Sequence, residues 1–373
     1  MNNTTLLKSK IYHLLDDFQH LQHPWQALLK NCPESRIFQT WAWHNCWLST
    51  FKSDVKLWVV TLWQQQQLIA IAPLYLDNKK VLHFIGTSNQ NQQATDYANF
   101  ICHPDYPQAL PQLLDVLLQN KSAWHELRLH NFYQNSPEYQ KTLPYLDSKQ
   151  PYYLTEFLYD SPSRILGDAD SDNKLLNYHR FRRLNNWFNR QGKLTYHHLT
   201  DKTELLAQLP HFFKQHQQRW NPTSTPSKFN QMTFVDFFQK LVTTFSDIKG
   251  LRLSYLTLDG EPIAYDCSLF YENYYIYYTP CYNLQYAKRS AGFLLHQYLL
   301  RYLIDNKIKA CDYSIGSESY KYRLSNEIHK VYQVRVFSKK YHYYLANIRN
   351  TIRQWLHQQP RLHHLVCQLR GVS

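Results

Sequence analysis

The chain has 373 residues, 44% of them hydrophobic and 18% charged, so it is long enough for two domains and has a globular composition. Its formal net charge of +13 suggests a polyanionic partner, such as a nucleic acid, a phosphorylated cofactor, an anionic saccharide or an acidic membrane surface, although extra Lys and Arg can also merely solvate a surface. Seven cysteines without C-x-x-C spacing argue against a disulfide framework and a zinc site. The first residues lack the apolar core of a signal peptide, and no apolar run reaches the ~18 residues of a membrane span, so we expect a cytoplasmic protein without a metal.

The first part of the chain opens with a helix and continues mainly with strands. Thr40 is a suitable N-cap for a helix over Trp41–Phe51, in which Trp43 and Trp47 stand at i, i+4 spacing and indicate a face that packs in the core. The elements predicted after it, in chain order, are strands Val55–Trp63, Leu68–Leu76 and Val81–Gly86, an apolar run Ala98–Cys102, a helix Pro107–Asn120 and a strand Glu126–His130.

The segment Pro144–Pro162 is a poor helix, and we predict that it bridges two units. We therefore divide the chain into residues 1–150, 151–340 and a C-terminal tail, 341–373. The elements predicted in the first part of the second unit are a basic helix Lys174–Arg190, a strand Leu194–Leu199, and helices Thr203–Trp220 and Thr233–Phe245.

The stretch Leu251–Arg323 is the most informative part of the chain. Asp259-Gly260 between alternating apolar runs predicts a hairpin, and a second tight turn gives three antiparallel strands up to about Thr279. An amphipathic helix, Ala291–Asn306, and a buried strand, Lys309–Ser314, follow. The strand, helix, strand order predicts a parallel pair at this point.

The start of the helix at Ala291 has the composition of an anion site. Lys288 and Arg289 precede it, Ser290 is a candidate cap, and Gly292 lets a ligand approach the backbone. Cations cost free energy beside the positive end of a helix dipole, whereas free amides and cations together bind phosphate. This favours a cofactor with phosphates, with a capped helix behind a solvated basic loop as the alternative.

An ordered set of short motifs extends over roughly Arg36 to Phe337. The motifs are Phe38–Trp47, Ala72-Pro73-Leu74, Phe84-Ile85-Gly86, Thr95-Asp96-Tyr97, Leu258–Ala264, Tyr282-Asn283, Ser290–Leu295, Asp312–Gly316 and Tyr320-Lys321. Together, and not through any single motif, they resemble the acyltransferases of the GNAT superfamily, and more narrowly their CelD-type and FemAB-like branch, associated with polysaccharide and cell-envelope synthesis.

The resemblance implies an α/β fold of two tandem GNAT-like units, with mixed, mostly antiparallel sheets flanked by helices, and an acyl-CoA site in the second unit. The pyrophosphate would lie on Lys288, Arg289, Ser290, Ala291, Gly292 and Phe293, and the pantetheine arm would run along Thr279 and Cys281. Tyr320 could protonate the leaving thiolate, and Lys321 could stabilise an oxyanion or hold an anionic substrate. The chain has Ala291-Gly292 where the family usually has Pro-Gly, and it lacks the glycine expected near Asn306.

Two carboxylates are candidates for the base that accepts the proton of an attacking amine or hydroxyl. Asp266 lies mid-strand among apolar neighbours, where an unpaired carboxylate is costly. It is either a base or the partner of a nearby arginine. Asp312 ends a strand and could instead bond the following turn. His296, on the helix, is assigned a structural role.

Three functions fit these observations. The first is an acyl-CoA-dependent N- or O-acyltransferase acting on a small-molecule or glycan acceptor. The second is an aminoacyltransferase using aminoacyl-tRNA, suggested by the charge and the arginines of Lys174–Arg190, but the long helical arm of several such enzymes is missing. The third is a non-catalytic scaffold, suggested by the missing glycines. No DNA partner is expected.

The C-terminal tail is basic and amphipathic. From Ile328 to Ser373 the sequence has no Asp or Glu. One apolar face is formed by Tyr341, Tyr344, Leu345, Ile348, Ile352, Trp355 and Leu356. Such a helix either packs on the domain or docks on an anionic membrane or a partner, which would place the protein at the inner face of the membrane.

Overall fold

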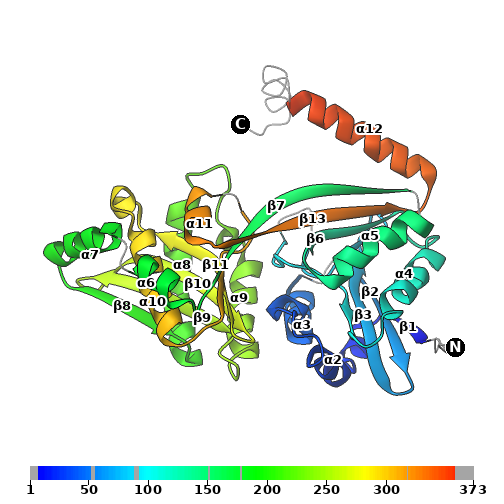
Figure 1. Ribbon diagram of the computed structural model, residues 1–373, viewed down its shortest axis with the longest axis horizontal. Coiled ribbons are helices and arrows are strands. Elements are labelled where there is room, and N and C mark those ends of the chain that lie inside the picture. The colour runs from blue at the N-terminus through cyan, green and yellow to red at the C-terminus, as the bar shows by residue number, and fades with distance from the viewer. Residues whose placement is uncertain are drawn as a thin grey trace.

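A single twisted sheet runs through the whole molecule (Figure 1). The computed structural model describes residues 7–51, 55–87, 92–149, 152–176, 179–316 and 318–357, the last six of these by their backbone only. In sheet order the strands of this described part are β1 (Lys8–Tyr12), β2 (Lys56–Gln64), β3 (Gln67–Leu76), β4 (Val81–Phe84), β6 (Glu126–Tyr133), β13 (Glu327–Phe337), β7 (Tyr153–Ile165), β12 (Ala310–Asp312), β11 (Tyr274–Tyr282), β10 (Glu261–Tyr271), β9 (Leu251–Leu258) and β8 (Leu194–Leu199), and β5 (Ile101–Cys102) pairs with β3 outside this path.

Helices cover both faces of this sheet. Those of the first half are α1 (Leu15–Gln19), α2 (Gln22–Leu29), α3 (Trp41–Phe51), α4 (Ala109–Gln119) and α5 (Pro137–Lys149). Those of the second half are α6 (Ala169–Leu176), α7 (His179–Gln191), α8 (Lys202–Trp220), α9 (Met232–Thr244), α10 (Ala291–Asp305), α11 (Ser319–Leu324) and α12 (Lys340–His357).

The two halves have the same local arrangement. In the first, β2, β3 and β4 are antiparallel, and α4 leads to β6, which is parallel to β4. In the second, β9, β10 and β11 are antiparallel, and α10 leads to β12, which is parallel to β11. The α/β class and the tandem arrangement expected from the sequence are confirmed. The residue limits of the units remain a prediction.

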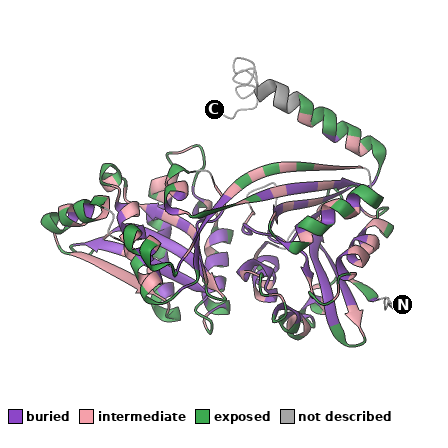
Figure 2. Cartoon of the chain, viewed as in Figure 1, coloured by how far each residue is buried: buried purple, intermediate pink, exposed green. Residues whose placement is uncertain are grey.

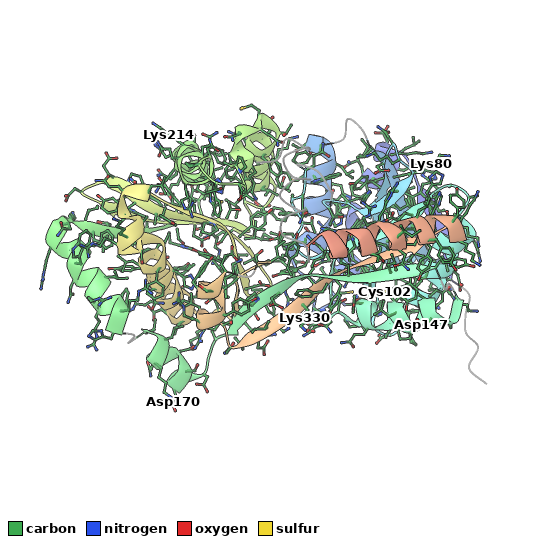
Figure 3. All side chains as sticks on the ribbon, turned by 90° about the horizontal axis from the view of Figure 1, so that it is seen from above. Lys80, Cys102, Asp147, Asp170, Lys214 and Lys330 are labelled. Carbon is green, nitrogen blue, oxygen red and sulfur yellow. The ribbon has the colours of Figure 1, made fainter. Side chains whose placement is uncertain are left out.

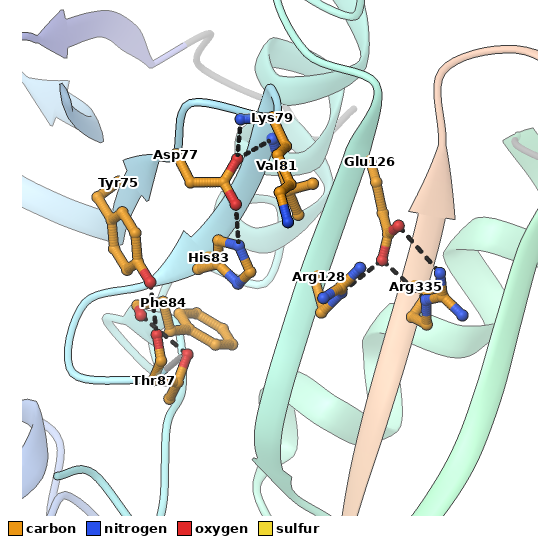
Figure 4. A network of polar contacts seen from close by, with 10 residues as sticks. All are labelled: Tyr75, Asp77, Lys79, Val81, His83, Phe84, Thr87, Glu126, Arg128 and Arg335. Atoms are coloured by element: carbon orange, nitrogen blue, oxygen red, sulfur yellow. Dashed lines mark hydrogen bonds and ion pairs between the residues drawn. The ribbon is translucent and has the colours of Figure 1, made fainter. Parts of the chain in front are cut away.

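Two long strands, β7 and β13, join the halves. β13 pairs with β6 on one side and with β7 on the other, and the end of β7 pairs with β12. Glu126 accepts a hydrogen bond from Arg128 of the same strand and, across the β6–β13 ladder, from both Nε and Nη2 of Arg335 (Figure 4). The segment Pro144–Pro162, predicted to be a poor helix that bridges two units, is helical up to Lys149, where α5 ends. From Tyr153 it belongs to β7, one of the strands that join the halves.

The largest core lies between the halves and is rich in aromatic side chains. Trp43 of α3 stands edge-on to Phe237 of α9, with ring centroids 5.4 Å apart, and Trp47 is fully buried. The predicted core role of this aromatic face is confirmed, and Figure 2 shows buried residues in the helices and strands of both halves. In the second half, α8 and α9 cover one face of the sheet and α6, α7 and α10 the other. Figure 3 accordingly shows Lys214 of α8 and Asp170 of α6 on opposite sides.

Local predictions were accurate where one turn or cap decided the structure. Thr40 Oγ1 accepts a hydrogen bond from the amide of Trp43, as an N-cap does. Asp259 and Gly260 both have positive φ, 50° and 87°, as a two-residue hairpin turn requires. The predicted helix in the tail is present as α12, and residues 358–373 lie outside the described residues.

Candidate active site

The ladder between β11 and β12 is short. The two strands pair only over Tyr274–Ile276 and Ala310–Asp312. On its other edge the register of β11 against β10 shifts by one residue, because Tyr277 and Tyr278 of β11 together stand opposite Ser268 of β10. Such a bulge bends a strand and increases its twist. Among the described residues, the second half of β11 therefore has no ladder with β12 and separates from it.

The start of α10 is positively charged but is not capped as predicted. Ser290 adopts the left-handed conformation, with φ 54°, and its hydroxyl accepts a hydrogen bond of 2.9 Å from Arg180 Nη2 rather than from an amide of the helix. The Arg180 guanidinium lies 4.9 Å from the ring centroid of Phe293, and that of Arg289 lies 4.6 Å from Trp187. Two guanidinium groups thus stand at the positive end of α10, a suitable place for an anion.

The remaining predicted cofactor residues surround this helix start. Lys288 is exposed and Ala291 is buried. A Cβ at Gly292 would lie 3.4 Å from Cδ1 of Tyr282, so the helix packs closely on β11. Thr279 and Cys281 are buried on β11, where the Thr279 hydroxyl lies 3.5 Å from Lys228 Nζ. Burial raises the pKa of the Cys281 thiol well above its usual value, which keeps it protonated.

A cluster of charged groups lies where the two halves meet. Asp96, from the first half, accepts a hydrogen bond from the hydroxyl of Ser314, just after β12. Burial raises the pKa of Asp96 to about 6, and this rise is limited by the Ser314 hydrogen bond and by the charges of Lys228 and Lys321. Burial also lowers the pKa of Lys228. Asp96 is therefore ionised at neutral pH yet close to its titration range.

Asp312 extends this cluster through the same turn. Its Oδ1 accepts hydrogen bonds from the Tyr97 hydroxyl at 2.6 Å and from the Ser314 amide at 2.7 Å. Burial is the main cause of its raised pKa, which the charge of Arg36 partly offsets. Asp312 thus bonds the following turn, which is the second of the two roles considered from the sequence. It also lies close enough to Asp96 to affect the pKa of that residue.

Tyr320 and Lys321 are neighbours on α11 but turn to different surroundings. Lys321 is buried, donates to the carbonyl of Ile315 at 2.8 Å and pairs with Glu318 at 3.1 Å. Its charge also acts on Asp96. Tyr320 packs in the apolar cluster under α10, where burial raises the pKa of its hydroxyl. Lys321 therefore belongs to the charged cluster, whereas Tyr320 lies on its apolar side.

Asp266 is fully buried in a different environment. Its Oδ2 accepts hydrogen bonds from Ser268 at 2.6 Å and from Tyr275 at 3.1 Å, and its Oδ1 has no partner in the described chain. Burial raises its pKa to about 7. The pairing with an arginine considered from the sequence is not present in the described part of the chain. His296 is buried near Tyr313, and burial lowers its pKa to about 3, consistent with its structural assignment.

A cavity of about 450 Å³ opens beside Asp312, between the two halves. Its walls come from the segment around Arg36, the segment Tyr97–Pro107, the start of α5, and the ends of β7, β12 and β13. Residues 288–293 are not part of its lining. Asp312 thus separates two regions, the charged cluster on one side and this cavity on the other.

The described ranges contain no group of three His, Cys, Asp or Glu that could hold a metal ion. Within the same ranges, none of the helices combines the length and apolar character needed to cross a membrane.

Comparisons with known proteins support the fold described above. Residues 177–322 match the model of the acetyltransferase (GNAT) domain. The fold of the chain is a double GNAT fold. Similar solved structures include FemX (TM-score 0.57, 9% identity, 88% of this chain and 98% of that chain) and a tandem GNAT protein from the clavulanic acid biosynthesis pathway (0.50, 10%, 89% and 99%). Another is the C-terminal DUF2156 domain of a provisionally named lysylphosphatidylglycerol synthetase from Agrobacterium fabrum (0.53, 10%, 90% and 96%). No curated protein matches the chain.

The double GNAT fold also brings together residues that sequence analysis did not assign to the site. Asp96 belongs to the motif Thr95-Asp96-Tyr97, which supported the resemblance, so the sequence did mark this residue. Its contact with Ser314 spans 218 positions, and no local pattern predicts such a contact. Lys228 lies in a loop rich in Pro and Ser, where no periodicity marks it. The roles predicted for Lys321, Tyr320, Asp266 and the residues at 279–293 remain predictions.

Proposed function

We propose that the chain is an acyltransferase that moves an acyl group from acyl-CoA to a nitrogen or oxygen of a sugar or glycan precursor. The observation that carries this proposal is the charged cluster of Asp96, Lys228 and Lys321 beside the separated strands β11 and β12. The GNAT domain match includes both the start of α10 and the Tyr320-Lys321 pair. The link to polysaccharide synthesis rests on the sequence resemblance.

The residues at the start of α10 fit an acyl-CoA pyrophosphate. Arg180 and Arg289 provide fixed positive charge, and the amides of Ala291 and Gly292 lie in the first turn of the helix, ahead of the backbone hydrogen bond from Leu294 to Ser290. Lys288 adds an exposed cation from the solvent side.

The charged cluster contains the groups that acyl transfer requires. In this proposal, the acceptor nitrogen or oxygen attacks the thioester carbonyl and its proton passes to the Asp96 carboxylate. The C–S bond then breaks, and the leaving thiolate takes up one proton, which protonated Asp96 can return, so that the thiol is released. Lys321 stabilises the negative charge that develops on the carbonyl oxygen. A pKa of about 6 suits Asp96 to this role, because the carboxylate is ionised at neutral pH and is still a usable base.

Calorimetric titration of acetyl-CoA and longer acyl-CoAs into the full chain tests the proposal. Arg180→Ala is expected to weaken binding roughly tenfold or more, because a charge-assisted contact is removed. Arg183→Ala is the matched control, since Arg183 is exposed on the same helix. A folded sample that binds none of these acyl-CoAs would overturn the proposal.

A second candidate is transfer from aminoacyl-tRNA. It is supported by α7, on which Arg182, Arg183 and Arg190 are all exposed, and by the net charge of +13. Such a protein would bind tRNA with a steep dependence on salt. A gel-shift assay at low salt decides this, and absence of a shift at micromolar protein removes the candidate.

A further inference from the structure

The floor of the cavity beside Asp312 is a row of three polar side chains from adjacent strands. Asp312 of β12 is directly opposite Ser163 of β7, and Ser163 is directly opposite Glu327 of β13. Directly paired residues project from the same face of a sheet. All three line the cavity, so a carboxylate, a hydroxyl and a second carboxylate form one continuous polar strip.

This strip has hydrogen-bonding capacity that the protein does not use. Ser163 Oγ is buried and has no hydrogen-bond partner in the described chain. Asp312 uses Oδ1 for two hydrogen bonds, and its Oδ2 accepts none from the described residues. An unpartnered buried polar atom is costly. A ligand that donates hydrogen bonds at this point would satisfy both groups.

The charge of the cavity is opposite to that of the chain. Four carboxyl groups and two cationic groups line it, a formal charge of −2 with His neutral, in a chain of net charge +13. The carboxyl groups are Glu34, Glu138, Asp312 and Glu327, and the cations are Arg36 and Lys141. The Arg36 guanidinium stacks 3.6 Å from the ring centroid of Tyr274 and is therefore held at the wall. Such a cavity attracts a cation.

We propose that this cavity binds the acceptor through a primary ammonium group on a hydroxyl-bearing skeleton, such as an amino sugar. Asp312 and Glu327 would accept the N–H donors, and Ser163 would bond the amine or a neighbouring hydroxyl. This proposal rests on the proposed acyl transfer and narrows it to nitrogen as the nucleophile. The overall step converts an ammonium and a thioester into an amide, a free thiol and one proton, with a C–N bond formed and the C–S bond broken.

The position of Asp312 links the cavity to the charged cluster. Its Oδ1 accepts the Ser314 amide hydrogen, and the Ser314 hydroxyl donates to Asp96. An amine held at Asp312 therefore lies one residue away from the proposed base. The ammonium must lose a proton before it can attack, and the carboxylates at both ends of this chain of contacts are available to accept it.

Binding of glucosamine, N-acetylglucosamine and glucose to the full chain, in the absence of acyl-CoA, tests this inference. We expect glucosamine to bind at least tenfold more tightly than the two neutral sugars, because only it carries an ammonium group. Glu327→Gln and Ser163→Ala should each reduce that preference. Glu261→Gln, which changes an exposed carboxylate outside the cavity lining, is the matched control and should leave it unchanged.

Equal affinity for the three sugars, or a preference that survives Glu327→Gln and Ser163→Ala, overturns the inference. Because no acyl-CoA is present, failure here is distinct from failure of the proposed function. Binding of acyl-CoA without an amine preference removes only the cavity assignment. Amine binding without acyl-CoA binding removes only the proposed acyl donor.

A second inference concerns α12, which extends above β7 and β13 (Figure 1). Its first turns contact the body through Tyr343, near Tyr152 and Phe337, and through buried Ala346. Four large apolar side chains on the helix are about half exposed: Tyr341 (53%), Tyr344 (48%), Leu345 (50%) and Ile348 (55%). Of the two arrangements considered from the sequence, packing on the domain is therefore not observed for these four residues.

We infer that this exposed face of α12 docks on an anionic lipid surface. Lys339, Lys340 and Arg349 are exposed beside it, and the sequence from Ile328 to Ser373 contains no acidic residue. A helix with an apolar face and only basic charge lies in a membrane interface, and each basic residue near an anionic surface strengthens binding.

Cosedimentation with vesicles of phosphatidylglycerol and phosphatidylcholine tests this second inference. The full chain should pellet with the anionic vesicles and not with pure phosphatidylcholine, and Leu345→Ser with Ile348→Ser should abolish pelleting. Phe157→Ser, which changes an exposed apolar residue of β7, is the control. Equal pelleting of the double variant and wild type overturns the inference. A concentration-dependent dimer in light scattering that the double variant abolishes, without pelleting, also overturns it and assigns the face to a second copy.

Discussion

The buried carboxyl of Asp266 makes the stability of this fold depend on pH. The side chain is fully buried under α10, with hydrogen bonds from Ser268 and Tyr275 to one oxygen only. Asp266→Asn keeps the shape and an acceptor oxygen for both hydroxyls while removing the ionisable group. The variant therefore isolates the effect of charge from the effect of packing.

The magnitude follows from the pKa of Asp266, raised from 3.8 to about 7 by burial. Between these values the folded state holds a proton that the unfolded state has lost. Raising the pH through this window therefore weakens the wild-type fold, and the contribution is fully present below about pH 4. Since one pH unit corresponds to about 1.4 kcal/mol, the loss by pH 8 is roughly 4 kcal/mol.

Urea unfolding of wild type and Asp266→Asn at several pH values from 4 to 8 measures this contribution. The difference in unfolding free energy should shift in favour of the variant by a few kcal/mol as the pH rises, and any pH-independent cost of the amide cancels from that change. Asp247→Asn, at an exposed carboxylate, is the control. A difference that stays constant across this range would refute the account of Asp266 as a group that burial keeps protonated.

Three further predictions concern the site and the joint between the halves. Gly86→Ala should lower the free energy of unfolding by roughly 2–4 kcal/mol, because Gly86 has φ +88° and a Cβ there would lie 2.0 Å from Thr95 Oγ1. A decrease below about 1 kcal/mol, measured by urea unfolding, would contradict this. Carboxyl NMR titration should give Asp96 a pKa of about 6, and Lys228→Met should move it higher because a stabilising positive charge is lost; an unchanged value would be inconsistent with the cluster. Glu126 has its pKa lowered to about 2 by Arg335 and Arg128 despite the opposing effect of burial, so its contribution to stability is present above about pH 4.5 and is lost as the pH falls towards 2. Glu126→Gln should therefore lose less stability than wild type as the pH falls from about 4.5 towards 2. The same loss in both proteins would contradict this role of Glu126.

Local patterns in the sequence were sufficient for the part of the fold that carries the proposed cofactor site. The strand β8 and the helix α3 match their predicted limits, and β9 to α10 follow the predicted order, because alternation, a two-residue turn and a long amphipathic run each act within a few residues. The same locality explains the error at Ser290. Serine is a common N-cap residue, but the Ser290 hydroxyl instead accepts a hydrogen bond from Arg180, which lies 110 positions earlier in the chain.

Long-range pairing accounts for what was missed. β13 has exposed charged residues among its apolar ones, and β7 contains Pro162, so neither has the pattern of a central strand. Both are stabilised by pairing with each other across the chain. The same holds for the site, because Asp96 and Ser314 come together only when the first half packs on the second.

Hydrogen–deuterium exchange of the full chain with and without acyl-CoA tests the central claim most directly. The account predicts slower exchange at the amides of Ala291, Gly292 and Phe293 and along the second half of β11, with the start of α8 unchanged as an internal reference. Unchanged exchange at these amides, or protection confined to other elements, would contradict the placement of acyl-CoA between β11 and β12.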